Sequence, residues 1–295
     1  MSDIKVELAL GSCFIKAVKV IQSPQKMQME ALKVRAQGRT IAFVPTMGAL
    51  HQGHLSIIDL AHTYADIVVV SIYVNPTQFG PNEDFAKYPR PIKKDTTLCQ
   101  SRKVGILFNP KTLYVPDHST WVNEDAVGSG LCGGSRPGHF RGVTTIVAKL
   151  FNIVQPHTAL FGQKDAQQCA VIERMVRDLN FPIKIVRAPI YREASGLAMS
   201  SRNVYLSEEE RRQSLALSSA LLQVKRSSIK TKAVRTLRKE AEGIISQAAP
   251  MARLDYIEFR QASSFEPLTS IVRGKTLVAV AAFFGKTRLI DNFIL

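Results

Sequence analysis

The sequence predicts an α/β protein with a parallel β-sheet flanked by helices, followed by a smaller C-terminal α+β domain. Over the first two-thirds of the 295 residues, short apolar runs alternate with segments of helical periodicity. Strands that are apolar on both faces and alternate with helices are typical of a covered parallel sheet. After Pro189 the order changes to two helices followed by adjacent strands. We therefore expect one domain in residues 1–188 and a second in residues 189–295.

The sheet begins with two runs rich in β-branched residues, at positions 40–45 (TIAFVP) and 67–74 (IVVVSIYV). Between them, Leu55, Ile58 and Ala61 recur on one face of a helix predicted over residues 54–65. A helix of that length can cross over between two parallel strands. Residues 104–108 predict a third strand.

The second half of the sheet has the same alternation. Residues 143–154 carry apolar side chains at helical spacing, and we expect Thr144, Lys149 and Asn152 to face away from the core. Two further strands are predicted at residues 159–161 and 183–186, on either side of a helix that begins near Asp165.

The C-terminal part opens with a capping box, because Ser207 and Glu210 have the spacing that satisfies free N–H groups at a helix start. We expect that helix to continue to Leu222 and a second one to cover residues 232–248. Strands are then predicted at residues 255–260, 276–283 and 287–292, the last two joined by a turn at Gly285-Lys286.

The composition excludes several classes of protein. The four cysteines, at positions 13, 99, 132 and 169, are scattered and include no C-x-x-C pair. This spacing argues against a zinc ribbon or a disulfide scaffold, and it favours a reducing, cytoplasmic compartment. No apolar run approaches the ~20 residues of a membrane span. The first residues lack the order of a secretory signal, so neither a membrane nor secretion is expected.

The charge is strongly basic, with 39 basic and 24 acidic residues giving +15. A potential of that sign attracts polyanions or a phosphate-bearing ligand. The densest basic run, residues 225–239, contains no acidic residue and no aromatic side chain for stacking on bases. We interpret it as a solvated helix face and do not expect a nucleic-acid partner.

The strongest chemical signal follows the first strand, in residues 44–54 (VPTMGALHQGH). His51 and His54 are three positions apart, so they share a face at the start of the crossover helix. The helix start offers free N–H groups and a positive dipole, which bind anions and disfavour imidazolium. Two neutral N–H donors there would stabilise charge on an α-phosphate. Gly48 and Gly53 would let a nucleotide approach the backbone.

Two other interpretations of these histidines stay open. They could cap the helix and serve structure alone. They could also bind a metal ion together with His62, although that residue lies a little over two helical turns beyond His54.

The next strand ends in Asn75 and Gln78, whose amides are neutral hydrogen-bonding groups. Ligands of parallel α/β sheets bind at the carboxyl ends of strands, so this loop should face the histidines. An amide can hold a hydroxy acid without quenching its carboxylate as a nucleophile. An ordinary Asn-Pro turn is the alternative. Residues 81–91, polar and rich in proline, are interpreted as a lid.

Two later segments add phosphate-binding side chains. Lys164 can reach phosphate oxygens, and Asp165 either holds magnesium or caps the helix, capping being favoured for this residue alone. Gln168, one turn on, should point to the same crevice. In residues 199–203 (MSSRN), two hydroxyls and the fork of Arg202 suit phosphates, so the second domain could close over ATP. By composition alone, a surface loop would be the simpler interpretation.

Taken in order, the segments PTMGALHQGH, VSIYVNPTQF, SRPGHFRGV, GQKDAQQ and GLAMSSRNVYLS resemble the pantoate–β-alanine ligase family of the H-x-G-H nucleotidylyltransferase superfamily. The resemblance covers residues 41–211, with weaker agreement in the C-terminal strands. It implies a Rossmann-like N-terminal domain, a smaller lid domain and a homodimer. It also implies condensation of (R)-pantoate with β-alanine through a pantoyl adenylate, with release of AMP and pyrophosphate.

The resemblance also implies roles for individual residues. Catalysis would fall to His54, His51, Lys164 and Arg202. ATP and its Mg²⁺ would be substrates, without a tightly bound prosthetic group, and Asp165 would hold the metal ion. Pantoate would contact Gln78, Gln168, Asn75 and Met47, and β-alanine would contact Gln78. ATP would contact Met47, Gly48, Ala49, Leu50, His51, Gln52, Gly53, His54, Gly162, Gln163, Lys164, Asp165, Tyr191, Met199, Ser200, Ser201 and Arg202.

Four positions depart from the family pattern: Gln163, Ala166, Ser195 and Tyr191. They bear on affinity and lid geometry more than on the reaction. Two rival functions stay open at this point. One is another H-x-G-H enzyme, such as a nucleotidylyltransferase or a truncated aminoacyl-tRNA synthetase, although no K-M-S-K-S segment is present. The other is a non-catalytic relative that binds polyanions.

Overall fold

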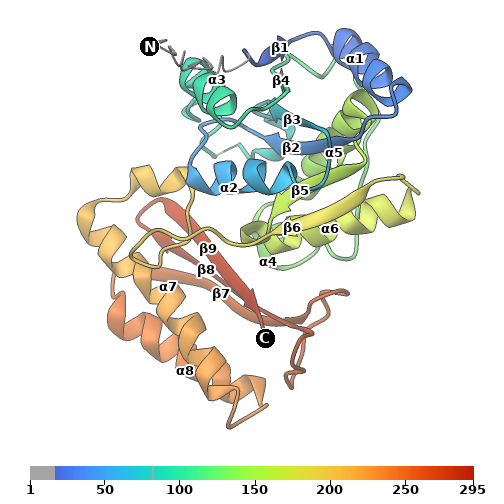
Figure 1. The fold of residues 1–295 in the computed structure, drawn as a ribbon. Coiled ribbons are helices and arrows are strands. Elements are labelled where there is room, and N and C mark those ends of the chain that lie inside the picture. The colour runs from blue at the N-terminus through green and yellow to red at the C-terminus, as the bar shows by residue number, and fades with distance from the viewer. Residues whose placement is uncertain (1–16, 82) are drawn as a thin grey trace, which may run out of the picture.

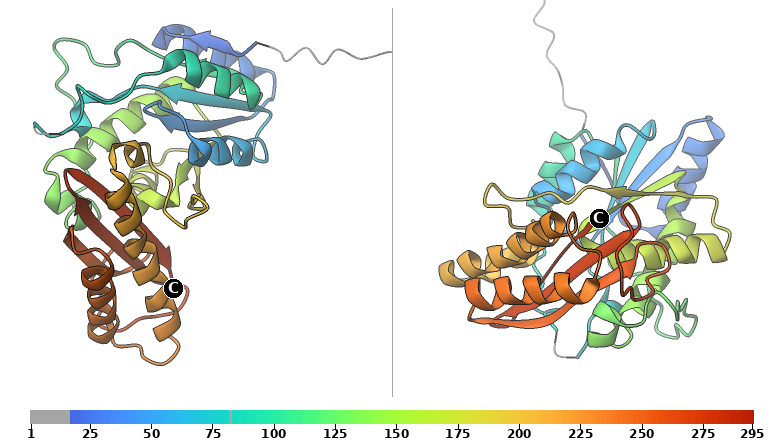
Figure 2. Two further views of the ribbon diagram at one scale, coloured as in Figure 1. Left: turned by 90° about the vertical axis from the view of Figure 1, so that its left-hand side faces the viewer. Right: turned by 90° about the horizontal axis from the view of Figure 1, so that it is seen from below.

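A computed structural model describes residues 17–81 and 83–295 of the chain. The predictions about Cys13 and about a secretory signal therefore lie outside the described residues. Figure 1 shows two lobes, a larger one around a parallel sheet and a smaller one of two long helices and three strands. The side view in Figure 2 shows the smaller lobe stacked beneath the larger one. The predicted fold class is confirmed.

The larger lobe contains a six-stranded sheet in the order β1-β4-β3-β2-β5-β6, in which every strand pairing is parallel. All five predicted strands are present, within a few residues of their expected bounds. The three-residue edge strand β1 was not predicted. The strands are β1 (Lys19–Ile21), β2 (Ile41–Thr46), β3 (Ile67–Ile72), β4 (Ile106–Phe108), β5 (Thr158–Gly162) and β6 (Lys184–Ala188).

Helices cover both faces of this sheet, because successive strand residues point to opposite sides. Ile41 and Phe43 pack against α1, α5 and α6, while Ala42 and Val44 pack against α2 and α3. Helices α1, α3 and α4 were not predicted. The helices of this lobe are α1 (Pro24–Ala36), α2 (Gln52–Ala61), α3 (Ile92–Ser101), α4 (Leu131–Ser135), α5 (His139–Val154) and α6 (Ala166–Asp178), with short 3₁₀ turns η1 (Pro76–Gln78) and η2 (Gln163–Asp165).

The expectation for the outer face of α5 is wrong at one position. Thr144 is fully buried, although Lys149 is half-buried and Asn152 is exposed as predicted. The hydroxyl of Thr144 donates to the carbonyl of Val122 at 2.6 Å, so a loop covers this side of the helix. A polar side chain that finds such a partner can be buried at little cost.

The strand order reverses between β2 and β5. Strands β3 and β4 lie on one side of β2, whereas β5 and β6 lie on its other side. Loops that leave the carboxyl ends of two such strands run in opposite directions and leave a crevice between them. Here those loops lead into α2 and η2, which carry the predicted histidine and lysine segments.

The smaller lobe is an antiparallel sheet, β7-β8-β9, covered on one face by α7 and α8 (Figure 1). The capping box is confirmed, because the Ser207 N–H donates to Glu210 at 2.8 Å and the Glu210 N–H donates to the Ser207 hydroxyl at 3.2 Å. The turn at Gly285 is also confirmed, with a φ of 56°. The elements are η3 (Ser201–Tyr205), α7 (Glu208–Ser227), α8 (Val234–Ala248), β7 (Ala252–Gln261), β8 (Thr276–Phe284) and β9 (Thr287–Ile294).

Strand β8 joins the two lobes. Val278, Val280 and Ala282 pack against α7 and α8, whereas Leu277 and Ala279 belong to the main apolar core of the larger lobe. The small sheet therefore lies between its own helices and the parallel-sheet lobe. The position of the boundary at residue 188 stays a prediction.

Two expectations about the surface can be compared with the structure. Of the seven basic side chains in residues 225–239, all are exposed except Arg238, which is half-buried beside Glu258. The basic run is therefore solvated as predicted, but it is not one helix face, because it spans the end of α7, the connection that follows and the start of α8. Among the helices of the described residues, none has the length and hydrophobicity that a membrane crossing requires.

Candidate active site

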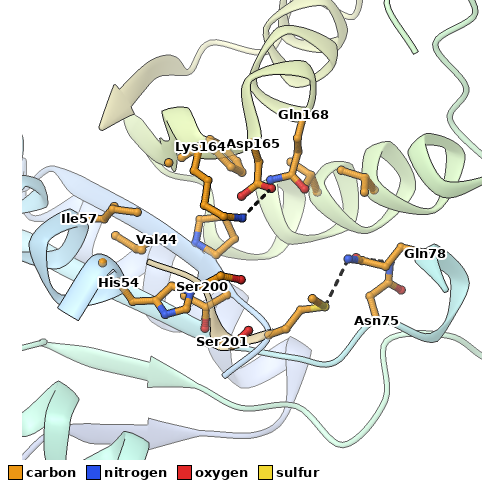
Figure 3. A pocket seen from close by; sticks show the side chains of 18 of the residues that line it. Val44, His54, Ile57, Asn75, Gln78, Lys164, Asp165, Gln168, Ser200 and Ser201 are labelled. Atoms are coloured by element: carbon orange, nitrogen blue, oxygen red, sulfur yellow. Dashed lines mark hydrogen bonds and ion pairs between the residues drawn. The ribbon is translucent and has the colours of Figure 1, made fainter. Parts of the chain in front are cut away.

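A cavity of about 260 Å³ lies at the carboxyl ends of β2 and β5. Its wall is formed by the loops that follow β2 and β3, by the inner face of α5, by η2 and by residues 189–202 from the segment that leads into the smaller lobe. Figure 3 shows side chains from these elements pointing into one space, with His54 and Lys164 on one side and Gln78 and Asn75 on the other.

His51 and His54 lie side by side at the start of α2, with ring centroids 4.0 Å apart. His51 is the N-cap residue, and its backbone N–H donates to Nδ1 of His54 at 3.4 Å. Because Nδ1 accepts this bond, the proton of the neutral His54 ring is on Nε2. His54 can therefore present an N–H donor to a ligand.

Both imidazoles are neutral near pH 7. Burial, and then the nearby charges of His51 and Lys164, lower the pKa of His54 to about 3. Burial and Lys164 lower the pKa of His51 to about 4, against a smaller opposite effect of Asp165. The rings are therefore neutral, as predicted, with burial as the largest cause, and their role as donors to a ligand stays a prediction.

The two glycines of the histidine loop make room for neighbouring protein atoms, and the expectation that they let a nucleotide approach stays a prediction. A Cβ on Gly53 would lie 3.0 Å from Cε1 of His51. Gly48 has a φ of 83°, and a Cβ there would lie 2.9 Å from the Ile72 side chain and 3.0 Å from the Asp95 carboxylate. Glycine is thus required so that the loop can fold tightly under the histidines.

Asp95 supports this loop from below, a role that the sequence did not reveal. Its buried carboxylate accepts the N–H groups of Ala49 at 2.8 Å and Leu50 at 2.9 Å. Burial raises the pKa of Asp95, and these two donors oppose that shift. Because the backbone of the loop is fixed by a neighbouring helix, the start of α2 is held in one conformation.

The amide loop after β3 faces the histidines, as predicted. Asn75 is buried and donates to Oε1 of Gln78 at 3.1 Å and to the carbonyl of Gly142 at 3.1 Å. Nε2 of Gln78 donates to the sulfur of Met47 at 3.3 Å. The segment does form a short turn, but its amides also line the cavity, so the interpretation as an ordinary turn is incomplete.

Lys164 and Asp165 project from η2 toward the histidines (Figure 3). Their charged groups are 3.6 Å apart. The expectation that Asp165 caps α6 is wrong, because its side chain makes no capping hydrogen bond although it occupies the N-cap position. The ion pair with Lys164 takes the carboxylate into the cavity instead, where Gln168 also lines the wall.

The metal interpretation of the histidines is not supported. His62 is turned to the protein surface, where Nε2 contacts the carbonyl of Arg102 at 2.8 Å. Throughout residues 17–81 and 83–295, no three His, Cys, Asp or Glu side chains come together as metal ligands.

Residues 199–202 line the cavity, so the interpretation as a mere surface loop is wrong. The guanidinium of Arg202 donates to both carboxylate oxygens of Asp84, at 2.9 and 3.3 Å. Tyr88 contacts the Ser201 hydroxyl at 3.5 Å. The segment interpreted as a lid therefore contacts, through Asp84 and Tyr88, two of the side chains that are expected to bind phosphate, Arg202 and Ser201.

Most predicted site residues converge on this cavity, and five do not line it. Gly48, Ala49, Leu50 and Gln52 belong to the loop behind the histidines, and Gln163 turns to Asn292 of β9 at 3.1 Å. Their roles stay predictions. The residues that do line the cavity are Met47, His51, Gly53, His54, Asn75, Gln78, Gly162, Lys164, Asp165, Gln168, Tyr191, Met199, Ser200, Ser201 and Arg202.

The family departures are each accommodated in the structure. Ala166 is buried at the start of α6, and the hydroxyl of Ser195 lies 3.5 Å from the Leu197 N–H. Tyr191 is 41% exposed at the rim of the cavity.

Sequence reasoning gave no role to several lining side chains, among them Arg136, His139 and Tyr88. The signal for the first two was present, because both belong to the segment SRPGHFRGV, to which no role was given. Tyr88 lies in the proline-rich segment, whose polar composition concealed a buried aromatic ring.

Comparison with known proteins gives one consistent result. The family model for pantoate-beta-alanine ligase matches residues 19–294. The pantothenate synthetase of Thermotoga neapolitana is 49% identical over 94% of this chain and 100% of its own length. That of Geotalea uraniireducens is 51% identical over 94% of this chain and 99% of its own length.

Solved structures agree with these relatives. The crystal structure of pantothenate synthetase from Thermus thermophilus is 39% identical with a TM-score of 0.88, over 94% of this chain and 99% of that one. Pantoate-beta-alanine ligase from Francisella tularensis, solved in complex with beta-gamma ATP and beta-alanine, is 34% identical with a TM-score of 0.77, over 94% of this chain and 98% of that one. The chain therefore belongs to the pantoate–β-alanine ligase family of enzymes.

Proposed function

We propose that this protein condenses (R)-pantoate with β-alanine in an ATP-dependent reaction that passes through pantoyl adenylate. The observation that carries the proposal is the convergence of two neutral imidazoles, one ammonium group and a pair of amides on a single cavity. This combination fits a nucleotide phosphate on one side and a hydroxylated acid on the other. The Francisella tularensis relative, solved with an ATP species and β-alanine, supports the same substrates.

In the first step, a carboxylate oxygen of pantoate attacks the α-phosphorus of ATP, and the bond to the pyrophosphate oxygen breaks. The negative charge that develops on the phosphoryl oxygens would meet the Nε2–H of His54 and the ammonium of Lys164. Donors fixed in advance at such a position stabilise the transition state more than the ground state. His51 keeps His54 oriented through the bond between its backbone N–H and Nδ1.

In the second step, the neutral amine of β-alanine attacks the acyl carbon of pantoyl adenylate. The carbon–oxygen bond to AMP breaks, and the nitrogen loses a proton as the amide forms. Gln78 and Gln168 would hold pantoate by neutral hydrogen bonds that leave its carboxylate reactive. Asn75 and Met47 hold the Gln78 amide, and Gln78 would also meet β-alanine.

The leaving pyrophosphate would be held from the linker side. Ser200, Ser201 and Arg202 line that wall of the cavity, and a guanidinium suits phosphate oxygens in a bidentate geometry. The main chain at Tyr191, which lines the cavity, would contact the adenine. Asp84 now accepts from Nε and Nη2 of Arg202, so a phosphate that takes these two donors would have to displace the Asp84 carboxylate.

Asp165 fits a role toward Mg²⁺. Its carboxylate is half-exposed in the cavity beside Lys164, and Mg²⁺ is commonly held by one or two carboxylates together with substrate phosphates. In the described part of the chain, no full protein cage of metal ligands competes with this arrangement. When bound with ATP, Mg²⁺ would neutralise charge on the phosphates.

Three further expectations are part of this proposal: a homodimer, a cytoplasmic location and a lid domain that begins after residue 188. The cytoplasmic location is supported by Cys99, Cys132 and Cys169, all of which are buried free thiols.

The decisive experiment supplies the purified full chain with pantoate, β-alanine and Mg–ATP and follows the products. Formation of pantothenate and AMP in equal amounts is expected. A stable nucleotidylated product would indicate a different H-x-G-H enzyme instead. Salt-dependent binding of nucleic acid without release of pyrophosphate would indicate a non-catalytic polyanion-binding protein.

A further inference from the structure

The segment SRPGHFRGV contacts the Gln78 turn at three points, although no role has been given to it. Nδ1 of His139 lies 2.8 Å from the carbonyl oxygen of Gln78, and Nη2 of Arg136 donates to the same oxygen at 3.2 Å. Gly142 packs against the turn so closely that a Cβ there would lie 2.3 Å from the carbonyl oxygen of Thr77. The start of α5 is thus fitted to the backbone of this turn.

The hydrogen bonds fix the protonation state of His139. Nη1 of Arg136 is 3.0 Å from Nε2 of His139, and a guanidinium can only donate, so Nε2 accepts. The ring proton is then on Nδ1, which donates to the Gln78 carbonyl. His139 is 9% exposed, and burial, followed by the charge of Arg136, lowers its pKa to about 4, in agreement with a neutral ring.

Arg136 is almost fully occupied by protein partners. Its Nε and Nη2 donate to the two carboxylate oxygens of Glu83, both at 2.6 Å, while Nη1 reaches His139 and Nη2 also reaches Gln78. A guanidinium with its donors engaged in this way is poorly placed to bind a substrate carboxylate. Its contacts hold the backbone instead.

The backbone of Gln78 determines where its side-chain amide lies. Oε1 accepts from Asn75, and Asn75 also donates to the carbonyl of Gly142, so the amide is tied to α5 as well. Nε2 donates to the sulfur of Met47, which also lines the cavity. A shift of the Gln78 carbonyl would therefore move the amide relative to the substrates.

We propose that His139 and Arg136 are positioning residues that clamp the Gln78 carbonyl and thereby set the affinity of the site for its two acid substrates. Neither side chain has to contact ATP for this role. The inference rests on the proposed function, in which Gln78 meets both pantoate and β-alanine.

The test compares three substitutions of His139 in the full chain. His139→Leu removes both hydrogen bonds. His139→Asn keeps a donor near the position of Nδ1, whereas His139→Gln places its amide near Nε2, beyond reach of the Gln78 carbonyl. The KM values for pantoate, β-alanine and ATP are measured for each, with kcat.

We expect the Leu and Gln variants to raise the KM for pantoate and β-alanine by about tenfold, the scale of one lost hydrogen bond, because the Gln78 carbonyl keeps only the longer contact with Arg136. The KM for ATP should change less than about twofold. His139→Asn should restore most of the affinity. Thr145→Val is the matched control, because it loses a hydrogen bond of α5 to Val122 outside the cavity and should change thermal stability but no KM.

Equal KM values in the Asn and Gln variants, or a parallel rise for all three substrates, would overturn the inference. This comparison also decides the matter if the Leu variant fails to fold. An unsubstituted protein that makes no pantothenate in the same assay would contradict the proposed function instead, so the two failures are distinguishable.

Discussion

At the scale of single residues, the site is organised around imidazoles that donate without carrying charge. His51, His54 and His139 all line the cavity and have lowered pKa values. A backbone N–H orients the ring of His54, and a guanidinium and a backbone carbonyl orient the ring of His139. The sequence could predict the pair in the histidine loop, because their spacing and the helix start are both visible in it. It could not predict the role of Asp95, because the two N–H groups that this carboxylate accepts are 46 and 45 positions away in the chain. The segment that contains Arg136 was visible, but its contact with the Gln78 carbonyl, 58 positions away, was not.

His54→Ala should reduce adenylate formation by about a hundredfold or more, the scale for removing one preorganised donor. His54→Gln, which can place an amide N–H near the position of Nε2, should retain more activity than the Ala variant. The measurement is pantoate-dependent ATP–pyrophosphate exchange, with circular dichroism to verify the fold. Near-normal exchange in His54→Ala would refute the role.

The lowered histidine pKa values predict how stability depends on pH. In the unfolded chain these residues titrate near 6.5, whereas in the folded protein His51 and His54 titrate near 4 and 3. Below pH 6.5 the unfolded state therefore binds more protons than the folded state. The stability that the neutral histidines contribute is complete above pH 6.5 and is lost as the pH falls toward 4. Thermal unfolding measured from pH 7.5 to 4.5 should show a falling midpoint, with a smaller fall in His54→Gln. A flat profile would contradict the assignment of neutral, buried rings.

At the scale of elements, the parts that were predicted have a strong apolar pattern, and the parts that were missed do not. Strands β2 and β3 are buried over most of their length, whereas β1 is a short edge strand with Lys19 and Val20 exposed. Helix α1 exposes Met29 and Leu32, and the two buried residues of α3 are Asp95 and Cys99. Such helices owe their place to neighbouring elements, and periodicity alone cannot reveal them.

Strand β9 supports the turn that carries Lys164. Nδ2 of Asn292 donates to the carbonyls of Gln163 at 3.0 Å and Lys164 at 2.9 Å, and Asn292 is buried. We expect Asn292→Ala to slow pyrophosphate exchange about tenfold and to lower the unfolding midpoint, because two buried carbonyls lose their donor. Asn292→Asp, which keeps the shape but cannot donate, should be at least as impaired. An Asp variant with normal exchange would show that the contact is dispensable.

Asp84 competes with phosphate for Arg202, if the proposed function is correct. Both side chains of this ion pair are partly exposed, at 33% for Arg202 and 25% for Asp84, and a pair of that kind contributes little free energy. Asp84→Asn should lower the KM for ATP by at most about fivefold. The control is Asp59→Asn, which removes a carboxylate of α2 from its exposed ion pair with Arg102. A raised KM would show that Asp84 assists nucleotide binding.

At the scale of the whole molecule, the two lobes share an apolar core through β8, a contact that the prediction of two domains did not include. The order of predicted helices and strands does change near Pro189. The packing of Leu277 and Ala279 into the core of the larger lobe, however, is not visible in local sequence patterns. The fold class could be predicted because alternating strands and helices restrict the topology strongly. The contact between lobes could not.

The shared core predicts a single cooperative unfolding transition. The chain has one tryptophan, Trp121, which lies in the larger lobe, whereas far-ultraviolet circular dichroism reports on helices of both lobes. Urea titrations followed by the two signals should therefore coincide. Separate midpoints would show that the lobes unfold independently, and α7 and α8 would then account for the second transition.

The grip of Asn292 on the turn of Lys164 joins residues 128 positions apart in the sequence. A ribosome makes the lysine long before it makes the asparagine. A nascent chain would already contain the histidine loop and Lys164, but the turn that carries Lys164 would still lack its hydrogen bonds to Asn292. If the Asn292 contacts support the reaction as expected, a chain cut before β9 should be less active than the full chain even though it keeps both histidines and Lys164.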